Sequence, residues 1–209
     1  MKALGIETST PIGSIAIVNE KNIIASSIFS SNVLNYGEWL GLEIKHLLSI
    51  SNTSISDIGL IAVSSGPGSF SGLRTGMAFG YGISKGLNIP VVSVATLDGL
   101  SFHFIEDERQ VCPIIDAKRK RIYTALYKKK RKISDYITCT IDDLFPLIRE
   151  ETIFLGDGAL LYKDLIREGL GNLAHFALSF KNIPLSINIA FLGVEYFKKG
   201  KINDGCIYP

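Results

Sequence analysis

The sequence predicts an α/β protein of two lobes, and the first 98 residues carry most of that prediction. Three short apolar strands are expected at 3–7, 14–18 and 23–29, with turns at 10–13 and 19–22 between them. Connections this short join antiparallel neighbours. A helix, a buried strand, a second helix and a further strand follow, so the order of the first lobe is β-β-β-α-β-α-β.

The two helices of this lobe are expected at about 35–49 and 71–87, the first with a capping box that begins at Asn35. The strand 58–63 lies between them, and the strand 91–94 comes after the second helix. Right-handed crossovers would add these strands to the initial meander in parallel. This strand order is that of the ribonuclease-H-like fold found in actin-like ATPases and sugar kinases, which we infer by analogy.

The second lobe is expected over 99–185, with weaker patterns than the first, and a last helix at about 186–200 would return to the first lobe. The elements expected in between are a helix over 96–105, a strand over 112–115 that ends at Asp116, a hairpin of 121–127 and 133–138 around the turn 128–132, a short helix over 142–150, a strand over 153–155 and a helix over 157–168.

The second helix of the first lobe carries an unusual row of small residues. Gly72, Gly76, Gly80 and Ser84 recur every four residues and therefore share one helical face. Each interior glycine costs about 1 kcal/mol relative to alanine, so the row needs a packing reason. Two interpretations remain open, and they can coexist: close packing in the chain's own core, and contact with a helix of a second protein. Large side chains flank the row, namely Phe70, Leu73, Met77 and Tyr81.

Composition indicates an ordinary globular protein, with 46% apolar and 20% charged residues. The formal net charge is +2, but it is unevenly distributed. Residues 1–98 hold five basic and six acidic residues, whereas the rest of the chain holds seventeen basic and fourteen acidic ones. Attraction for nucleic acid therefore belongs to the second half. The N-terminus becomes polar too soon for a signal peptide and no run of 18 apolar residues occurs, so a cytoplasmic location is expected. Cys112, Cys139 and Cys206 have neither metal-ligand nor disulfide spacing.

Four motifs resemble the bacterial TsaB (YeaZ) family: IETST near the start, SGPGSFSGLRTG in the middle, VVSVATLDGL after Pro90, and IIDAKRKRIYTALY in the second lobe. The resemblance implies a non-catalytic partner of TsaD, which transfers a threonylcarbamoyl group to the adenosine beside the anticodon of tRNAs that read codons beginning with A. It also implies that a small ATPase, TsaE, joins the complex, and that the chain can form homodimers when alone.

In this family the interfaces are built from the two helices of the first lobe. The sequence departs from the family at Tyr36, where histidine is common, at Glu7, where aspartate is usual, and in a tail that stops at Tyr208-Pro209. The residues that we expect to bind the partner are Tyr36, Leu40, Ile44, Phe70, Gly72, Arg74, Gly76, Met77, Gly80 and Tyr81.

An independent enzyme is the alternative. A metalloprotease or metal-dependent transferase would need clustered ligands, but His46, His103 and His175 lack helical ligand spacing, so no metal is expected. A small-molecule kinase or ATPase of the same fold could use Glu7 in the first hairpin and Asp116 in the second lobe. No cofactor is expected, although ATP or ADP at the partner interface stays open.

Two clusters of cations, 118–121 and 128–132, flank the predicted strand 121–127 in the second lobe. Such clusters can contact tRNA phosphates, although a solvated turn is the ordinary explanation for a run of cations. The residues that we expect at a tRNA contact are Lys118, Arg119, Lys128, Lys129 and Lys130.

Overall fold

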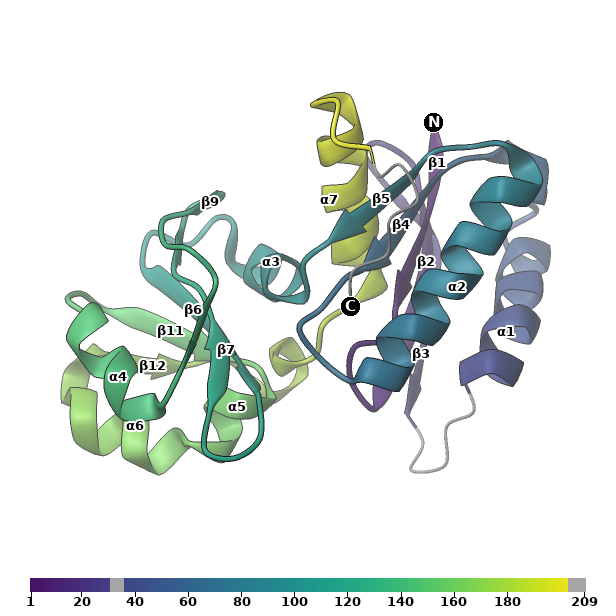
Figure 1. Ribbon diagram of the computed structural model, residues 1–209. Coiled ribbons are helices and arrows are strands. Elements are labelled where there is room, and N and C mark those ends of the chain that lie inside the picture. The colour runs from purple at the N-terminus through teal and green to yellow at the C-terminus, as the bar shows by residue number, and fades with distance from the viewer. Residues whose placement is uncertain (31–35, 203–209) are drawn as a thin grey trace. The chain divides into compact units, whose positions relative to one another are not determined.

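The computed structural model describes residues 1–30 and 36–202 and separates the chain into two compact units (Figure 1). Unit 1 consists of Met1–Gly99 together with the C-terminal segment from Pro184, and unit 2 is Leu100–Ile183. Unit 2 is therefore an insertion in the sequence of unit 1. The sequence-based division placed the boundaries after 98 and after 185. Three features named in the sequence analysis lie outside the described residues: the expected capping residue Asn35, Cys206, and the terminal Tyr208-Pro209.

Unit 1 contains one five-stranded sheet in the order β3-β2-β1-β4-β5. The first three strands are antiparallel, and β4 and β5 extend them in parallel. This confirms the predicted meander with crossovers and the ribonuclease-H-like class. The elements are β1 (Lys2–Glu7), β2 (Ile12–Val18), β3 (Ile23–Ser30), α1 (Tyr36–Ile50), the 3-10 turn η1 (Ile55–Asp57), β4 (Ile58–Ser64), α2 (Phe70–Leu87), β5 (Val91–Val94) and α7 (Ser186–Lys198). The helix α3 (Thr96–Ser101) begins in unit 1 and ends in unit 2.

Helices cover both faces of this sheet. Alternate residues of β1 point to opposite sides, and from Ala3 on the residues of both sides are buried. Leu4 and Ile6 face α1 and α2 in the main apolar core of the unit. On the other face α7 comes so close that a Cβ at Gly5 would overlap the carbonyl oxygen of Ser186. Figure 1 shows α1 and α2 side by side on one face and α7 on the other.

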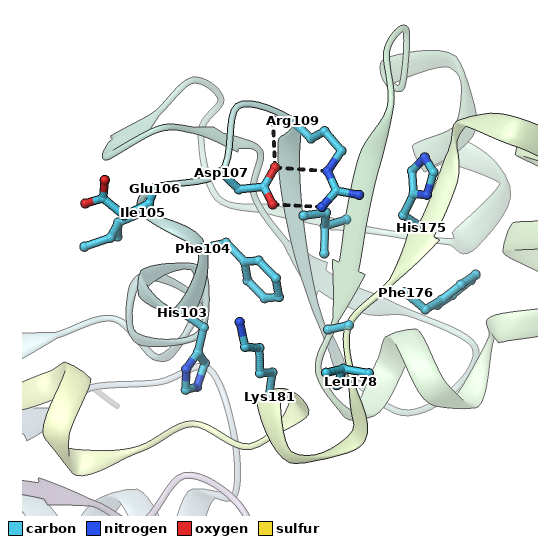
Figure 2. Close-up of a pocket in the computed structure, with 12 residues that line it drawn as sticks. His103, Phe104, Ile105, Glu106, Asp107, Arg109, His175, Phe176, Leu178 and Lys181 are labelled. Atoms are coloured by element: carbon cyan, nitrogen blue, oxygen red, sulfur yellow. Dashed lines mark hydrogen bonds and ion pairs between the residues drawn. The ribbon is translucent and has the colours of Figure 1, made fainter.

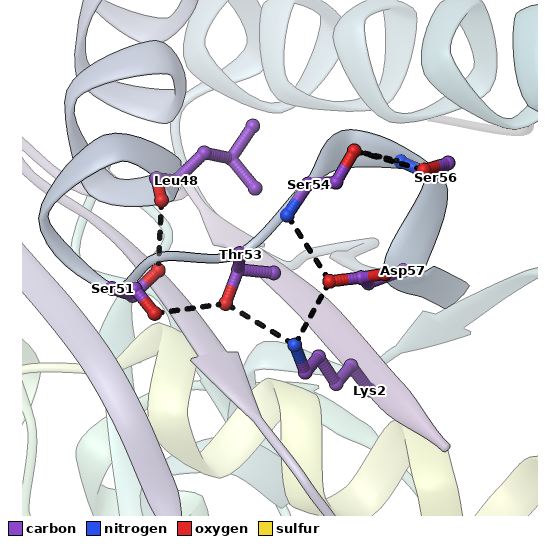
Figure 3. A network of polar contacts seen from close by, with 7 residues as sticks. All are labelled: Lys2, Leu48, Ser51, Thr53, Ser54, Ser56 and Asp57. Carbon is purple, nitrogen blue, oxygen red and sulfur yellow. Dashed lines mark hydrogen bonds and ion pairs between the residues drawn. The ribbon is translucent and has the colours of Figure 1, made fainter.

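A polar network fastens the connection between α1 and β4 to the first strand (Figure 3). The ammonium of Lys2 lies 3.1 Å from Asp57 Oδ2 and 3.4 Å from Thr53 Oγ1. Asp57 also accepts from the backbone N–H of Ser54, whose side chain caps η1. The exposed fractions of the Lys2 and Asp57 side chains, 32% and 46%, indicate a modest contribution to stability.

Unit 2 contains a second sheet in the order β10-β7-β6-β11-β12; the short strand β8 also pairs with β6, and β9 pairs with β8. The strands β6, β11 and β12 are parallel, and the others pair antiparallel. Its elements are the 3-10 turn η2 (Phe102–Phe104), β6 (Gln110–Asp116), β7 (Ile122–Thr124), β8 (Tyr127–Lys128), β9 (Arg131–Lys132), β10 (Ile137–Cys139), α4 (Ile141–Leu144), η3 (Phe145–Leu147), β11 (Thr152–Leu155), α5 (Asp157–Leu161), α6 (Lys163–Leu170), η4 (Gly171–Leu173), β12 (Ala174–Phe176) and η5 (Ser179–Asn182).

Several details differ from the sequence-based expectations. The predicted turn 128–132 is itself the hairpin of β8 and β9, and the strand β12 was not predicted. The helix expected over 157–168 is divided at Tyr162, which ends α5. Asn88, with φ of 54°, takes the left-handed position that closes α2, whereas Gly86 was expected there.

Within residues 1–30 and 36–202, the structure contains no helix that is both long and apolar enough to span a bilayer.

Candidate functional site

The row of Gly72, Gly76, Gly80 and Ser84 on α2, called here the buried row, packs against the sheet of unit 1. A Cβ at Gly72 would overlap the carbonyl oxygen of Thr8, and one at Gly76 would overlap Thr8 Oγ1. At Gly80 it would overlap a methyl group of Val63. Thr8 Oγ1 also donates a 2.8 Å hydrogen bond to the carbonyl of Gly72. The own-core interpretation of the small residues is therefore the correct one for this row.

Most of the residues expected to bind a partner belong to the same core. Tyr36 is half-buried, its hydroxyl donates to the carbonyl of Thr10, and burial followed by the charge of Glu7 raises its pKa to about 12. Helix periodicity groups residues by face but does not say which face meets the sheet, and here the apolar face does. Seven of the residues expected to bind the partner are buried within the chain, and their assignment to the partner face stays a prediction: Leu40, Ile44, Gly72, Gly76, Met77, Gly80 and Tyr81.

A second row on α2, called here the open row, lies on the exposed side of the helix. It consists of Phe70, Arg74, Ala78, Gly82 and Gly86, again four residues apart. Phe70 is 56% exposed, and the Arg74 guanidinium carbon lies 3.8 Å from the centre of its ring. A Cβ at Gly82 or Gly86 would meet nothing within 4 Å. Of the residues expected to bind the partner, only Phe70 and Arg74 belong to this row.

The exposed side of α1 adjoins α2. A Cβ at Gly41 would lie 3.6 Å from the ring of Phe79, which is ordinary van der Waals contact between the two helices. Leu42, on the outer side of α1, is 71% exposed, and Lys45 one turn later is also exposed. Sequence reasoning missed Leu42 and Lys45 on α1 and the open row on α2. The row was visible in the sequence, because Gly82 and Gly86 follow Phe70 at multiples of four residues.

The carboxyl end of β1 holds a sealed acid. Glu7 is fully buried, its Oε1 accepts a 2.6 Å hydrogen bond from the Ser9 N–H, and its Oε2 has no hydrogen-bond partner among the described residues. Burial raises the pKa of Glu7, and the hydrogen bonds to Ser9 offset only part of that effect. A carboxyl group of this kind is not available to a substrate in solution.

The other candidate acid, Asp116, binds Lys118 in the loop that follows β6. Its Oδ1 accepts from the Lys118 N–H at 2.9 Å, and its Oδ2 pairs with the Lys118 ammonium at 2.7 Å. Burial acts to raise the pKa of Asp116, but the contacts with Lys118 outweigh it and lower the pKa overall. The three cations Lys118, Arg119 and Lys120 have φ values of 62°, 52° and 61°, a left-handed conformation that costs L-residues about 1–2 kcal/mol each.

The second cation cluster is the β8–β9 hairpin, and intramolecular ion pairs already engage part of it. Lys128 pairs with Glu150, and the Lys129 ammonium lies 3.0 Å from a Glu108 carboxylate oxygen. Lys130 is exposed and forms no ion pair with any described residue. Since β7 and β8 run together along β6, the loop 118–121 and this hairpin lie roughly 20 Å apart, at opposite ends of that stretch. The cations form two patches.

A cavity of about 470 Å³ lies within unit 2, and we call it the Arg109 cavity (Figure 2). Its walls come from the segment 103–109, from Ile153, and from the chain around β12 through to Lys181. His103 and His175, interpreted from sequence as surface or packing residues, both line it. Sequence reasoning missed the cavity, because three separate segments build it and no spacing within one segment indicates it.

Across residues 1–30 and 36–202, no three His, Cys, Asp or Glu side chains come together in a group that could hold a metal ion. The Cys112 thiol is fully buried, and this burial raises its pKa to about 12.

Comparisons with a family model, with protein sequences and with solved structures each find TsaD, TsaB or YeaZ proteins similar to this chain. Residues 33–197 match the family model described as "TsaD: tRNA N6-adenosine threonylcarbamoyltransferase". The "tRNA threonylcarbamoyladenosine biosynthesis protein TsaB" of Bacillus subtilis is 28% identical over 93% of this chain and 88% of that protein. The protein of the same name from Escherichia coli is 29% identical over 62% of this chain and 56% of that protein. The structure of "YeaZ from Pseudomonas aeruginosa" superimposes with a TM-score of 0.80 at 20% identity, over 96% of this chain and 94% of that one, and shows the same fold.

Proposed function

This chain belongs to the family of TsaD, the tRNA N6-adenosine threonylcarbamoyltransferase, and from that membership we propose that it acts in tRNA threonylcarbamoyladenosine biosynthesis as a TsaB-type subunit that binds TsaD. The relatives named TsaB support the process. The sealed Glu7 supports a non-catalytic role, because a kinase of this fold needs an accessible acid at this end of the first strand to hold magnesium.

The observation that carries the partner-binding proposal is the contrast between the glycines of α2. Each glycine within a helix costs about 1 kcal/mol relative to alanine. Gly72, Gly76 and Gly80 allow the helix to approach its own sheet, which explains their presence. A Cβ at Gly82 or Gly86 would meet no described atom within 4 Å, so close packing against the described part of the chain does not explain these glycines. We propose that TsaD packs on the open row, with Phe70 and Arg74 at one end.

The test is to place a large side chain on the open row. Since a Cβ at Gly82 lies in open space, Gly82→Leu should leave the chain folded and weaken binding to its cognate TsaD at least tenfold in calorimetric titration. Glu168→Leu, which adds the same side chain at an exposed position of α6 in unit 2, is the matched control and should retain affinity.

Unchanged TsaD affinity in the folded Gly82→Leu variant would refute the open row as the interface. A separate assay addresses the non-catalytic role: the chain alone, given an activated threonylcarbamoyl donor and tRNA, should form no modified adenosine, and product formed without TsaD would establish an independent enzyme.

The open row is also our candidate surface for the other complexes expected from the sequence. We propose that the open row can also pair with a second copy when TsaD is absent, that TsaE joins the TsaD-bound form, and that any ATP or ADP enters at that interface. Light scattering at increasing concentration should show a dimer for the natural chain and a monomer for Gly82→Leu. A dimer in both would place the self-contact elsewhere.

Contact with tRNA is proposed for the exposed cations of unit 2. Arg119 and Lys130 form no ion pair with described residues, whereas Lys118, Lys128 and Lys129 are paired within the chain. Replacing Arg119 and Lys130 by glutamine should therefore lower the salt dependence of tRNA binding by the TsaD complex, by about one unit of slope for each phosphate that is no longer neutralised. Lys21→Gln, at an exposed turn of unit 1, is the control. An unchanged slope in the double variant would exclude these cations.

A further inference from the structure

The exposed side of α2 carries two cations on one face. Arg74 and Lys85 are both exposed, and α2 contains no acidic residue. They are eleven residues apart, which in an α-helix is three full turns and about 20°, so their side chains share a face. The small residues Ala78 and Gly82 lie between them on this face. The rise along the helix axis from one cation to the other is about 16 Å.

Neither cation is neutralised within the described part of the chain. The Arg74 guanidinium and the Lys85 ammonium form no ion pair with any described residue, including the acids Glu38 and Glu43 of the neighbouring helix α1. Lys85 lies in the last turn of α2, where a cation is favoured by the helix dipole. Arg74 lies in the second turn and has no such stabilisation, so its charge is the one that the chain's own fold leaves unexplained.

The contact with Phe70 presents Arg74 to a partner. The guanidinium carbon lies 3.8 Å from the centre of the Phe70 ring, a distance at which the planar group stacks on the aromatic face. The N–H donors lie in the plane of the guanidinium, so stacking leaves them available to an acceptor. Phe70 is 56% exposed, so the pair is open to solvent. Among protein side chains, a carboxylate matches this planar set of donors in two-point fashion.

The middle of the same face admits a helix. The distance between packed helix axes depends on the side chains at the contact, and the smallest side chains allow the closest approach. Ala78 and Gly82 are exposed, and a Cβ at Gly82 would meet no described atom within 4 Å. A helix that packs over these two residues has its own side chains beside Arg74 at one end of the contact and beside Lys85 at the other.

We propose that the element of TsaD that packs on the open row is a helix with two carboxylates about 16 Å apart, one opposite Arg74 and one opposite Lys85. This inference rests on the proposed function and adds the charge pattern of the partner. The two ion pairs fix the register of the partner helix, because a slip by one turn, about 5.4 Å, separates both pairs at once.

The test compares glutamine with glutamate at each cation, because these side chains have nearly the same shape and differ in charge. In calorimetric titrations of the full chain with its cognate TsaD at low salt, Arg74→Glu should bind at least tenfold more weakly than Arg74→Gln, since the new carboxylate faces the proposed acid. The difference should narrow at high salt, where exposed charges are screened. A role in packing alone would weaken both variants equally.

Lys85→Glu should likewise bind more weakly than Lys85→Gln. The matched control is the pair Arg149→Gln and Arg149→Glu, at an exposed position of unit 2 that forms no ion pair with a described residue, and these two variants should bind TsaD equally. Since the substituted side chains are all exposed, every variant should keep the melting temperature of a folded chain.

Equal TsaD affinity within either the Arg74 or the Lys85 pair, or a difference that does not change with salt, would overturn the two-acid partner. So would a difference confined to self-association measured without TsaD, which would assign the acids to a second copy of this chain. A failure of the proposed function has another signature, because Gly82→Leu would then leave TsaD binding unchanged. If Gly82→Leu weakens binding and the charge variants do not differ, only the present inference fails.

Discussion

The two sides of α2 carry similar residues for different physical reasons. On the buried row, glycine is required because the backbone and side chain of Thr8 occupy the space where a Cβ would stand. On the open row, Gly82 and Gly86 are exposed, and no contact with residues 1–30 or 36–202 requires a glycine there. A glycine row in a helix therefore does not by itself identify an interface; the glycines that the chain's own fold leaves unexplained do.

The largest expected effect is on the buried row. Gly76→Leu would place its side chain on Thr8 Oγ1, and Thr8 has little room to move because it is buried directly after β1, the central strand of the sheet. Overpacking of this kind should lower the free energy of unfolding by about 3 kcal/mol or more. Urea denaturation of Gly76→Leu beside Gly82→Leu measures the difference, and equal stability of the two variants would contradict the asymmetry of the two sides.

A smaller effect is expected at the sealed acid beside the buried row. Since burial raises the pKa of Glu7 in the folded state, the unfolded state loses this proton first as pH rises. The contribution of Glu7 to stability therefore falls between its unfolded pKa, about 4.5, and its higher folded pKa. Glu7→Gln keeps an oxygen to accept from Ser9 and removes the titration.

The measurement for this variant is the difference in unfolding free energy between Glu7→Gln and the natural chain across pH 4 to 8. The variant should gain relative stability as pH rises. A difference that is constant with pH would mean that Glu7 ionises as easily in the folded state as in the unfolded one.

The smallest expected effect is a stabilisation on the open row. Gly82→Ala fills open space and improves helix propensity, so the free energy of unfolding should rise by about 1 kcal/mol. For a chain of this size that corresponds to roughly 2–4 °C in the melting temperature, measurable by calorimetry. Gly76→Ala is the matched comparison and should lower the melting temperature, since even one methyl group there overlaps Thr8.

The sequence was most informative where apolar periodicity is strong. The strands β1, β2 and β4 are nearly continuous buried runs, and α1 and α2 have clear apolar faces. In unit 2, apolar periodicity did not predict the strands β8, β9 and β12. The hairpin of β8 and β9 consists of cations after Tyr127, with no apolar alternation, and β12 is only three residues long, so neither carries a periodic signal.

The candidate site was predictable only in part. Helical spacing grouped the small residues of α2 on one face, but it left open whether that face meets the core or a partner, and Met77, expected at the partner, is buried in the core. Which glycines touch Thr8 and which face solvent depends on how α2 docks on the sheet, and that is a tertiary property. The Arg109 cavity lies further still from prediction, because it exists only once the segment 103–109 and β12 are brought together.

The packing of α7 has a consequence for synthesis on the ribosome. This helix covers the face of the first sheet that includes Gly5 and Ala62, yet its residues are translated after the whole inserted unit. The inserted residues Leu100–Ile183 emerge earlier and complete their own core without it. Nascent chains halted before Pro184 should therefore combine a finished inserted unit with a first sheet that has one uncovered side, which is the stage at which this protein most needs a chaperone.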